Sequence, residues 1–322
     1  MALEVTLSPA TAGEGRGEGR VAVERNLPSA SLTLPLNPER AWRVEGSGRG
    51  YLFLRILAIA LGLFAIVKSA GAGEAPYGGA SPVSCLKLTL ADVGHVLSAP
   101  VRWDGQDWLV FGGLALGVAA AYTADAPIRD AARRSQDKSA GRSLTVVEQL
   151  GSWGGFGVIG GIYAAGLVSG KSGLMDAGFD ALVSVGIAGG IITPAIKYSV
   201  GRSRPWKDEG IHKFRPFSGN VSFPSGHTTQ AFAIASVVAE SSESVWLGGV
   251  SYALAATVGA ARIYHDAHFA SDVLAGAVIG TATGVAVVRY NRERRARAEP
   301  AAVQFVPLYV MGTPAAAVAI NY

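Results

Sequence analysis

The sequence predicts an all-α protein, a bundle of about six core helices embedded in a membrane. Hydrophobic residues make up 49% of the 322 positions, and charged residues make up 16%, below the roughly 25% that is usual for soluble domains. Mean hydropathy is positive, at +0.30. The apolar segments are rich in glycine and alanine with small residues at regular spacing. This composition favours closely packed helices over strands.

The first 106 residues precede the predicted bundle. Residues 1–50 carry no helical or strand period and contain a repeated Gly-Glu-Gly-Arg, so we expect them to be disordered. Residues 51–72 combine a basic flank, an apolar centre and small residues at the exit, which is typical of a secretory signal, with an uncleaved membrane anchor as the alternative. We expect residues 73–106 to be a linker. Cys85 is the single cysteine, which excludes an intrachain disulfide.

The predicted catalytic domain covers residues 107–290. Its helices are expected at six apolar segments, namely 107–123, 153–169, 178–196, 228–240, 245–263 and 272–289. Several are shorter than the roughly 20 residues that span a bilayer. A spanning bundle and an exported bundle of short helices are therefore both open.

Residues 291–322 are expected as a basic flank and a C-terminal tail, with a weak strand signal in 303–322. Five arginines lie between Arg289 and Arg297. They indicate either a solvated helix end or a cytoplasmic flank under the positive-inside rule.

Three stretches far apart in the chain carry the candidate site. Lys197 ends one apolar segment, His227 begins another, Arg262 ends a third and Asp272 begins the last. A helix advances about 1.5 Å per residue, so the hairpin after His227 brings Arg262 back to the same level. We therefore expect all these residues to meet on one face of the bundle.

The residue types at this face suit a phosphoryl group. Lys197, Arg204 and Arg262 supply three cations, and arginine offers paired donors to phosphate oxygens. Ser225 and Gly226 precede a helix, where backbone N–H groups bind anions and glycine permits close approach. Such an array stabilises the charge that spreads over phosphorus during transfer.

Two histidines and a carboxylate supply the chemistry. Asp272 follows His268 by four residues and can orient it as the nucleophile, while His227 can protonate the departing oxygen. No metal or other cofactor is needed. A rival interpretation uses His265, Asp266, His268 and Asp272 as metal ligands, but three nearby cations disfavour a divalent ion.

At these residues the chain resembles the type 2 phosphatidic acid phosphatase (PAP2) superfamily, which includes bacterial acid phosphatases and vanadium haloperoxidases. The matching motifs are Lys197-x6-Arg204-Pro205, Pro224-Ser225-Gly226-His227 and Arg262-x5-His268-x3-Asp272. Ala261 stands where the family usually has serine. The resemblance covers roughly 107–290. It implies a helical bundle in which His268 forms a phosphohistidine, Asp272 orients His268 and His227 acts as the acid. The residues that it implies for phosphate binding are Lys197, Arg204, Ser225, Gly226 and Arg262.

The expected substrate is a lipid phosphate or diphosphate such as phosphatidate, undecaprenyl diphosphate or a lipid A phosphate. An exported acid phosphatase acting on small phosphomonoesters is the first alternative, a vanadium haloperoxidase the second, and a non-catalytic membrane scaffold the least favoured. The sequence indicates a membrane partner and no nucleic acid, and it leaves the oligomeric state open.

The topology depends on which segments span. If the six later segments span from the inside, the site faces outward and the arginines face inward. If the 52–67 segment is a cleaved signal, or spans as well with its N-terminus inside, this assignment reverses. We expect a cell-envelope protein, either in the inner membrane with its site facing the periplasm or exported to the periplasm.

Overall fold

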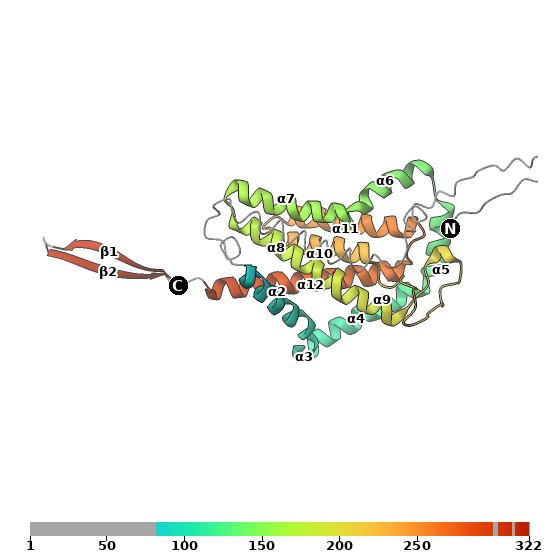
Figure 1. The fold of residues 1–322 in the computed structure, drawn as a ribbon, viewed down its shortest axis with the longest axis horizontal. Helices are drawn as coiled ribbons and strands as arrows, with labels where there is room; N and C mark the ends of the chain where they lie inside the picture. Colours follow the sequence, from blue (N-terminus) through green and yellow to red (C-terminus); the bar gives the residue numbers. More distant parts are fainter. Residues whose placement is uncertain (1–81, 299–301, 311–312, 322) are drawn as a thin grey trace, which may run out of the picture. The chain divides into compact units, whose positions relative to one another are not determined.

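The computed structural model describes residues 82–298, 302–310 and 313–321. The predicted disordered extension 1–50 and the predicted signal or anchor 51–72 lie outside the described residues. The described chain forms a helical bundle, which confirms the predicted fold class (Figure 1). Its α-helices are α2 (Pro82–Leu97), α3 (Ala99–Arg102), α4 (Gly105–Thr123), α5 (Asp125–Arg134), α6 (Lys138–Glu148), α7 (Trp153–Ser169), α8 (Ser172–Ile187), α9 (Thr193–Val200), α10 (Gly226–Ser241), α11 (Val245–Tyr264) and α12 (Ala270–Ala298).

The six predicted segments all lie in helices. A π-helical turn at Ala188–Ile192 joins α8 to α9, so the segment expected at 178–196 is part of one longer helical run. The run Ser172–Val200 and the helix Ala270–Arg297 are long and apolar enough to cross a membrane. Two pairs, α4 with α5 and α6 with α7, pass the same test together but bend by 54° and 55°.

Helix α10 lies at the centre, against α7, α8, α11 and α12. Its contact with α12 is close because glycines recur every fourth residue on α12. A Cβ on Gly276 would lie 2.6 Å from the Ser225 carbonyl oxygen, and one on Gly280 would lie 2.3 Å from the Thr229 carbonyl oxygen. Glycines at this spacing let helix backbones touch. The start of α12 is thereby fixed beside the start of α10.

The range 73–106 differs from the linker that we expected, because its described part carries α2 and α3. Leu88, Val93 and Val96 of α2 pack against a core cluster that includes Phe179. The three side chains recur at helical spacing, which buries one face of α2 in the bundle. Residues 82–97 are therefore part of the fold.

The basic flank differs from a purely solvated helix end, because α12 continues to Ala298 and two of its arginines form ion pairs with buried carboxylates. Arg295 pairs with buried Asp180 at 2.8 Å, and Arg294 pairs with buried Asp92 at 3.3 Å. Nearby, Arg289 pairs with Glu240 at 3.1 Å. These ion pairs tie the end of α12 to α2, α8 and α10.

The tail contains two antiparallel strands, β1 (Ala302–Val310) and β2 (Thr313–Asn321), with Ala302 opposite Asn321. This agrees with the weak strand signal in 303–322.

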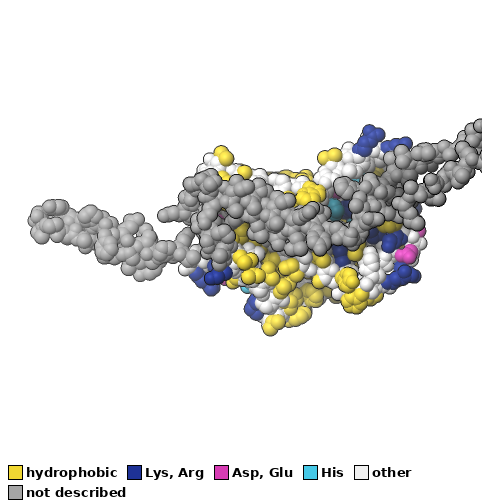
Figure 2. Space-filling view, in the orientation of Figure 1, with side chains coloured by type: hydrophobic (Ala, Val, Ile, Leu, Met, Phe, Trp, Pro, Cys, Tyr) yellow, Lys and Arg dark blue, Asp and Glu magenta, His cyan; other side chains and the backbone are white. Residues whose placement is uncertain are grey.

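Large apolar side chains are exposed on the bundle. Figure 2 shows them gathered along the lower edge, where α2, α3 and α4 lie in Figure 1. They include Leu90, Val101, Trp108, Leu109 and Leu116. An exposed apolar surface of this kind suits contact with lipid.

Candidate active site

The chain reverses after α9 and brings the first motif back onto the bundle. Gly201 ends α9 with a φ of +60°, and a Cβ there would lie 1.7 Å from the Arg215 carbonyl oxygen. The Arg215 N–H donates to the Gly201 carbonyl at 2.8 Å, which closes the loop. On α9 the Nζ of Lys197 donates to the Val221 carbonyl at 2.6 Å. Lys197 therefore faces the loop that leads to the second motif.

The second motif forms the start of α10. The Ser225 N–H donates to the Asp272 carbonyl at 2.9 Å, which ties the start of α10 to the start of α12. The Ser225 hydroxyl accepts from Thr228 and is buried. A Cβ on Gly226 would make only ordinary contacts, at 3.8 Å from Lys197 and 3.9 Å from Thr193. The protein itself leaves room for a side chain at this position.

The third motif spans the end of α11 and the start of α12. The His268 N–H donates to the Arg262 carbonyl at 3.2 Å. The Nδ1 of His268 lies 3.7 Å from Oδ2 of Asp272, beyond hydrogen-bond range, and has no hydrogen-bond partner among the described residues. The structure therefore brings the expected pair together without forming the hydrogen bond between them.

His268 is the point on which the motifs converge. Burial lowers the pKa of His268 well below its usual value of 6.5, and the charges of Arg204, Lys197, Arg262 and His227 lower it further. Its imidazole is therefore neutral at neutral pH and can act as a nucleophile. Segments separated by 75 residues in sequence meet here, as the hairpin argument predicts.

Arg262 is held by a carboxylate that the sequence analysis missed. Glu148 at the end of α6 accepts from Nη1 of Arg262 at 2.9 Å, and its same oxygen lies 3.0 Å from Nδ1 of His265. All three side chains are largely buried. Glu148 thus positions Arg262 and balances part of its charge.

The rival metal site is divided among separate partners. His265 faces Glu148, and Asp266 pairs with Arg133 at 2.7 Å. Neither is directed to the His268–Asp272 pair. Among the described residues no group of three His, Cys, Asp or Glu side chains is placed to hold a metal ion.

Asp272 is enclosed by a second set of residues that the sequence analysis missed. Its Oδ1 accepts from Arg202 at 2.6 Å, and its Oδ2 accepts from Ser222 at 2.6 Å and from the Phe269 N–H at 2.9 Å. Arg202 also donates to Asp125 of α5 at 2.7 Å. Arg202 lies two residues before Arg204 in the first motif, so its position was a signal. Nothing in the sequence around Asp125 or Ser222 signalled a place in this site.

The remaining histidines lie away from this group. His212 contacts the Tyr122 hydroxyl at 2.5 Å, and His95 stacks on Tyr290. Cys85 is buried.

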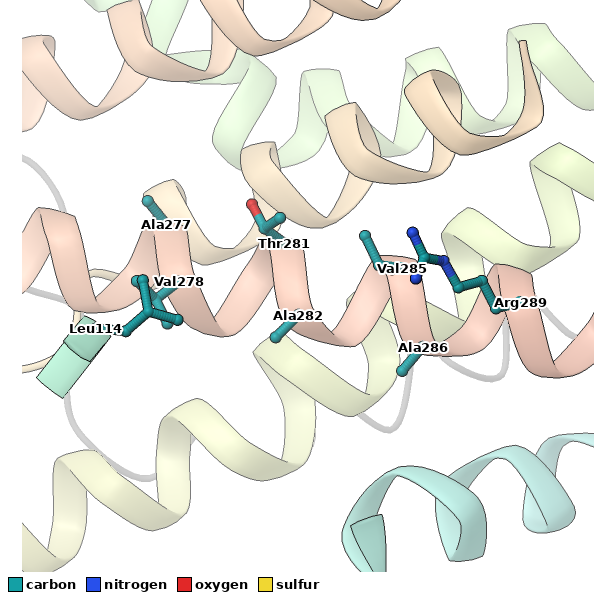
Figure 3. A pocket seen from close by; sticks show the side chains of 8 residues that line it. All are labelled: Leu114, Ala277, Val278, Thr281, Ala282, Val285, Ala286 and Arg289. Atoms are coloured by element: carbon teal, nitrogen blue, oxygen red, sulfur yellow. The ribbon is translucent and has the colours of Figure 1, made fainter. Parts of the chain in front are cut away.

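A separate groove of about 540 Å³ runs along α12 (Figure 3). It is lined by Leu114 of α4 and by Ala277, Val278, Thr281, Ala282, Val285, Ala286 and Arg289 of α12. Its lining is almost wholly apolar, and no histidine or carboxylate lies among these residues. The groove begins five residues after Asp272 on the same helix.

Comparisons with known proteins agree with the motifs. Residues 177–296 match the model of the PAP2 superfamily, which confirms the resemblance. The chain is 39% identical over 107 residues to a lipid A 1-phosphatase of Porphyromonas gingivalis, covering 33% of this chain and 21% of the relative. It is 34% identical over 96 residues to a lipid A 1-phosphatase of Rhizobium etli, covering 28% and 40%. It is 30% identical over 106 residues to undecaprenyl-diphosphatase BcrC of Bacillus subtilis, covering 33% and 54%. The matched stretch is thus between about a fifth and about half of each relative.

Two solved structures match the chain at low identity. The crystal structure of Aquifex aeolicus LpxE matches 52% of this chain and 95% of its own, with 22% identity and a TM-score of 0.41. A PAP2-type phosphatidylglycerolphosphate phosphatase from Bacillus subtilis matches 65% and 96%, with 22% identity and a TM-score of 0.44.

Proposed function

We propose that the PAP2 superfamily domain of this chain is a metal-independent phosphatase that hydrolyses a lipid phosphate through a phosphohistidine on His268. The observation that carries the proposal is the buried His268, whose N–H donates to the Arg262 carbonyl and whose Nδ1 lies 3.7 Å from Asp272. The charges of Lys197, Arg204 and Arg262 act on it together and lower its pKa. Such an arrangement binds a phosphoryl dianion and presents a nucleophile to it without a metal. A non-catalytic scaffold gains nothing from this convergence.

In the first step Nε2 of His268 attacks phosphorus, and the bond from phosphorus to the leaving oxygen breaks. His227 donates a proton to that oxygen, so the alcohol or phosphate leaves neutralised. The cation on His268 forms beside Asp272, whose carboxylate stabilises it. In the second step His227 removes a proton from water, the water oxygen attacks phosphorus, and the bond to Nε2 breaks to release phosphate.

The apolar surface supports a lipid substrate. In the described part of the chain, two helical runs are long and apolar enough to cross a membrane, and apolar side chains are exposed over α2 to α4. The relatives named lipid A 1-phosphatase make a lipid A 1-phosphate the first substrate to test, and the relative named undecaprenyl-diphosphatase makes that diphosphate the second.

The direction of the helices supports an outward-facing site. Asp272 and Arg295 lie at opposite ends of α12, separated by about 35 Å at 1.5 Å per residue. Arginines flanking a span favour the cytoplasmic side. The site would then face the periplasm from the inner membrane.

The activity is tested with detergent-purified protein in EDTA, using lipid A, undecaprenyl diphosphate, phosphatidate and p-nitrophenyl phosphate. We expect phosphate release that is strongest with a lipid substrate and absent in His268→Ala. Normal turnover by His268→Ala would refute the mechanism. Preference for p-nitrophenyl phosphate would favour the exported acid phosphatase, and vanadate-dependent bromide oxidation without hydrolysis would favour the haloperoxidase.

The two-step mechanism is tested with His227→Ala. p-Nitrophenolate leaves without help from an acid, whereas the second step needs a base to activate water. We therefore expect a burst of about one p-nitrophenol per site, followed by slow turnover. Slow release without a burst would contradict a covalent intermediate that depends on His227 for its breakdown.

Orientation is tested by cysteine labelling in intact cells, in a Cys85→Ala background. Phe217 lies in the loop near the site and Arg297 lies at the far end of α12, and both are exposed. We expect a membrane-impermeant maleimide that reaches the periplasm to label Phe217→Cys and to label Arg297→Cys only after lysis. The reverse pattern would place the site in the cytoplasm.

A further inference from the structure

Arg202 forms a buried clamp between two carboxylates. Its Nη1 donates to Asp272 at 2.6 Å, and its Nη2 donates to Asp125 at 2.7 Å. The exposed fraction is 1% for Arg202 and 0% for each carboxylate, so water contributes little to their solvation. A guanidinium offers paired donors in a fixed plane, which a lysine cannot reproduce.

Neighbouring groups hold the clamp in one geometry. Ser271 accepts from Arg202 at 2.8 Å and donates to Asp125 at 2.5 Å, and its N–H donates to Asp125 at 2.9 Å. The guanidinium carbon lies 4.1 Å from the centre of the Phe269 ring and 4.9 Å from that of Tyr122. Rings at these distances favour a cation. The clamp joins the start of α5 to the start of α12.

We propose that Arg202 and Asp125 are positioning residues that fix the Asp272 carboxylate beside His268 and set the negative charge that His268 experiences. The inference rests on the phosphatase mechanism proposed above. Two carboxylates share one guanidinium, so the clamp keeps one net negative charge next to the nucleophile. Both Nη atoms of Arg202 are engaged by these partners.

Charge balance gives the clamp a testable sign. His268 attacks in its neutral form, so the acid limb of the kcat/KM profile reports its protonation. Removal of a negative charge lowers the pKa of His268, and removal of a positive charge raises it. The other charged groups acting on His268, namely Lys197, Arg204, Arg262 and His227, are the same in every variant.

The first experiment compares Asp125→Asn with wild type on the preferred substrate. Asparagine is similar in size to aspartate, so the variant is expected to fold. We expect its acid limb to move to lower pH by about half a unit or more, with kcat about 10-fold lower and KM within about threefold. An acid limb at the same pH as in wild type would overturn the proposal.

The second experiment tests the opposite sign. Arg202→Met should move the acid limb to higher pH and lower kcat on the order of 100-fold, because the Asp272 carboxylate loses its anchor. Arg202→Lys should restore the pH of the acid limb to that of wild type but should restore only part of kcat. The double variant Arg202→Met with Asp125→Asn restores the net charge, so its limb should return toward that of wild type.

A matched control lies at the far end of α12. Arg295 and Asp180 form another buried ion pair, at 2.8 Å, about 35 Å away along the helix. Arg295→Met and Asp180→Asn should destabilise the fold without moving the limb. Equal shifts in these controls would show that the effect is only structural. An inactive wild type would instead refute the proposed function, so the two failures are distinguishable.

Discussion

Glu148 is expected to act on catalysis only through Arg262, and Glu148→Gln tests this. One carboxylate oxygen serves both Nη1 of Arg262 at 2.9 Å and Nδ1 of His265 at 3.0 Å. Glutamine keeps the volume, but its amide accepts on one side and donates on the other. A charged hydrogen bond contributes about 1.5–3 kcal/mol and a neutral one about 1 kcal/mol. The substitution should therefore cost about 0.5–2 kcal/mol for each bond changed.

Part of that cost should appear in the transition state, because Arg262 would be held less firmly against the phosphoryl oxygens. A loss of about 1.4 kcal/mol corresponds to a tenfold fall in kcat/KM. Arg262→Ala removes the donor itself and should lower kcat/KM by about 100-fold or more. The double variant should then be no slower than Arg262→Ala alone, because Glu148 has lost the group through which it acts.

The assay is phosphate release under kcat/KM conditions, with inhibition by orthovanadate as a second measure of phosphate binding. Glu240→Gln is the control, since Glu240 pairs with Arg289 near the far end of α12. It should leave both measurements unchanged. A further tenfold loss in the double variant would refute the reasoning, because Glu148 would then act on substrate by another route.

Four other substitutions test separate features. Gly226→Ala should fold normally, because the added Cβ would meet nothing closer than 3.8 Å. If phosphate approaches the Gly226 backbone, the variant should weaken vanadate inhibition by about tenfold or more. Unchanged vanadate inhibition would remove Gly226 from the phosphate site. Gly280→Ala should lower stability in thermal unfolding by about 1–3 kcal/mol, because the added Cβ would lie 2.3 Å from the Thr229 carbonyl oxygen. The control Gly113→Ala should leave stability unchanged, because the space around Gly113 is open. Burial raises the pKa of Asp92 from 3.8 to about 6, so the folded state holds this proton more tightly than the unfolded state. The contribution of Asp92 to the free energy of unfolding is then complete below about pH 4 and declines by at most about 3 kcal/mol as the pH rises to about 6. Denaturant titrations at about pH 4 and about pH 6 should show a smaller decline in Asp92→Asn than in wild type. Ala282→Trp would fill the groove along α12. It should raise KM for the lipid substrate without changing KM for p-nitrophenyl phosphate. Equal changes in the two KM values would show that no lipid chain lies in the groove.

The sequence alone predicted the six apolar helices and the candidate site residues. Apolar segments of the right length specify a helix by their own composition, and all six lie in helices of the structure. Lys197, His227 and Arg262 were recognisable because each stands at the end of such a segment, where a short loop must bring it near the others. The linker expectation for 73–106 failed because polar residues interrupt the apolar residues of α2. Its burial therefore depends on a partner surface that includes Phe179.

Only the tertiary structure decided what surrounds the candidate site residues. Asp125 and Glu148 are single carboxylates in polar connections, and nothing local distinguishes them from solvated side chains. Each lies more than 75 positions from the arginine that it holds, and the pairing exists because α5 and α6 pack against the ends of α11 and α12. Local sequence fixes backbone conformation over a few residues, whereas the burial of a charge depends on every element that excludes water from it. The motifs of the chain therefore indicate the proposed nucleophile, whereas only the folded structure shows the groups proposed to position it.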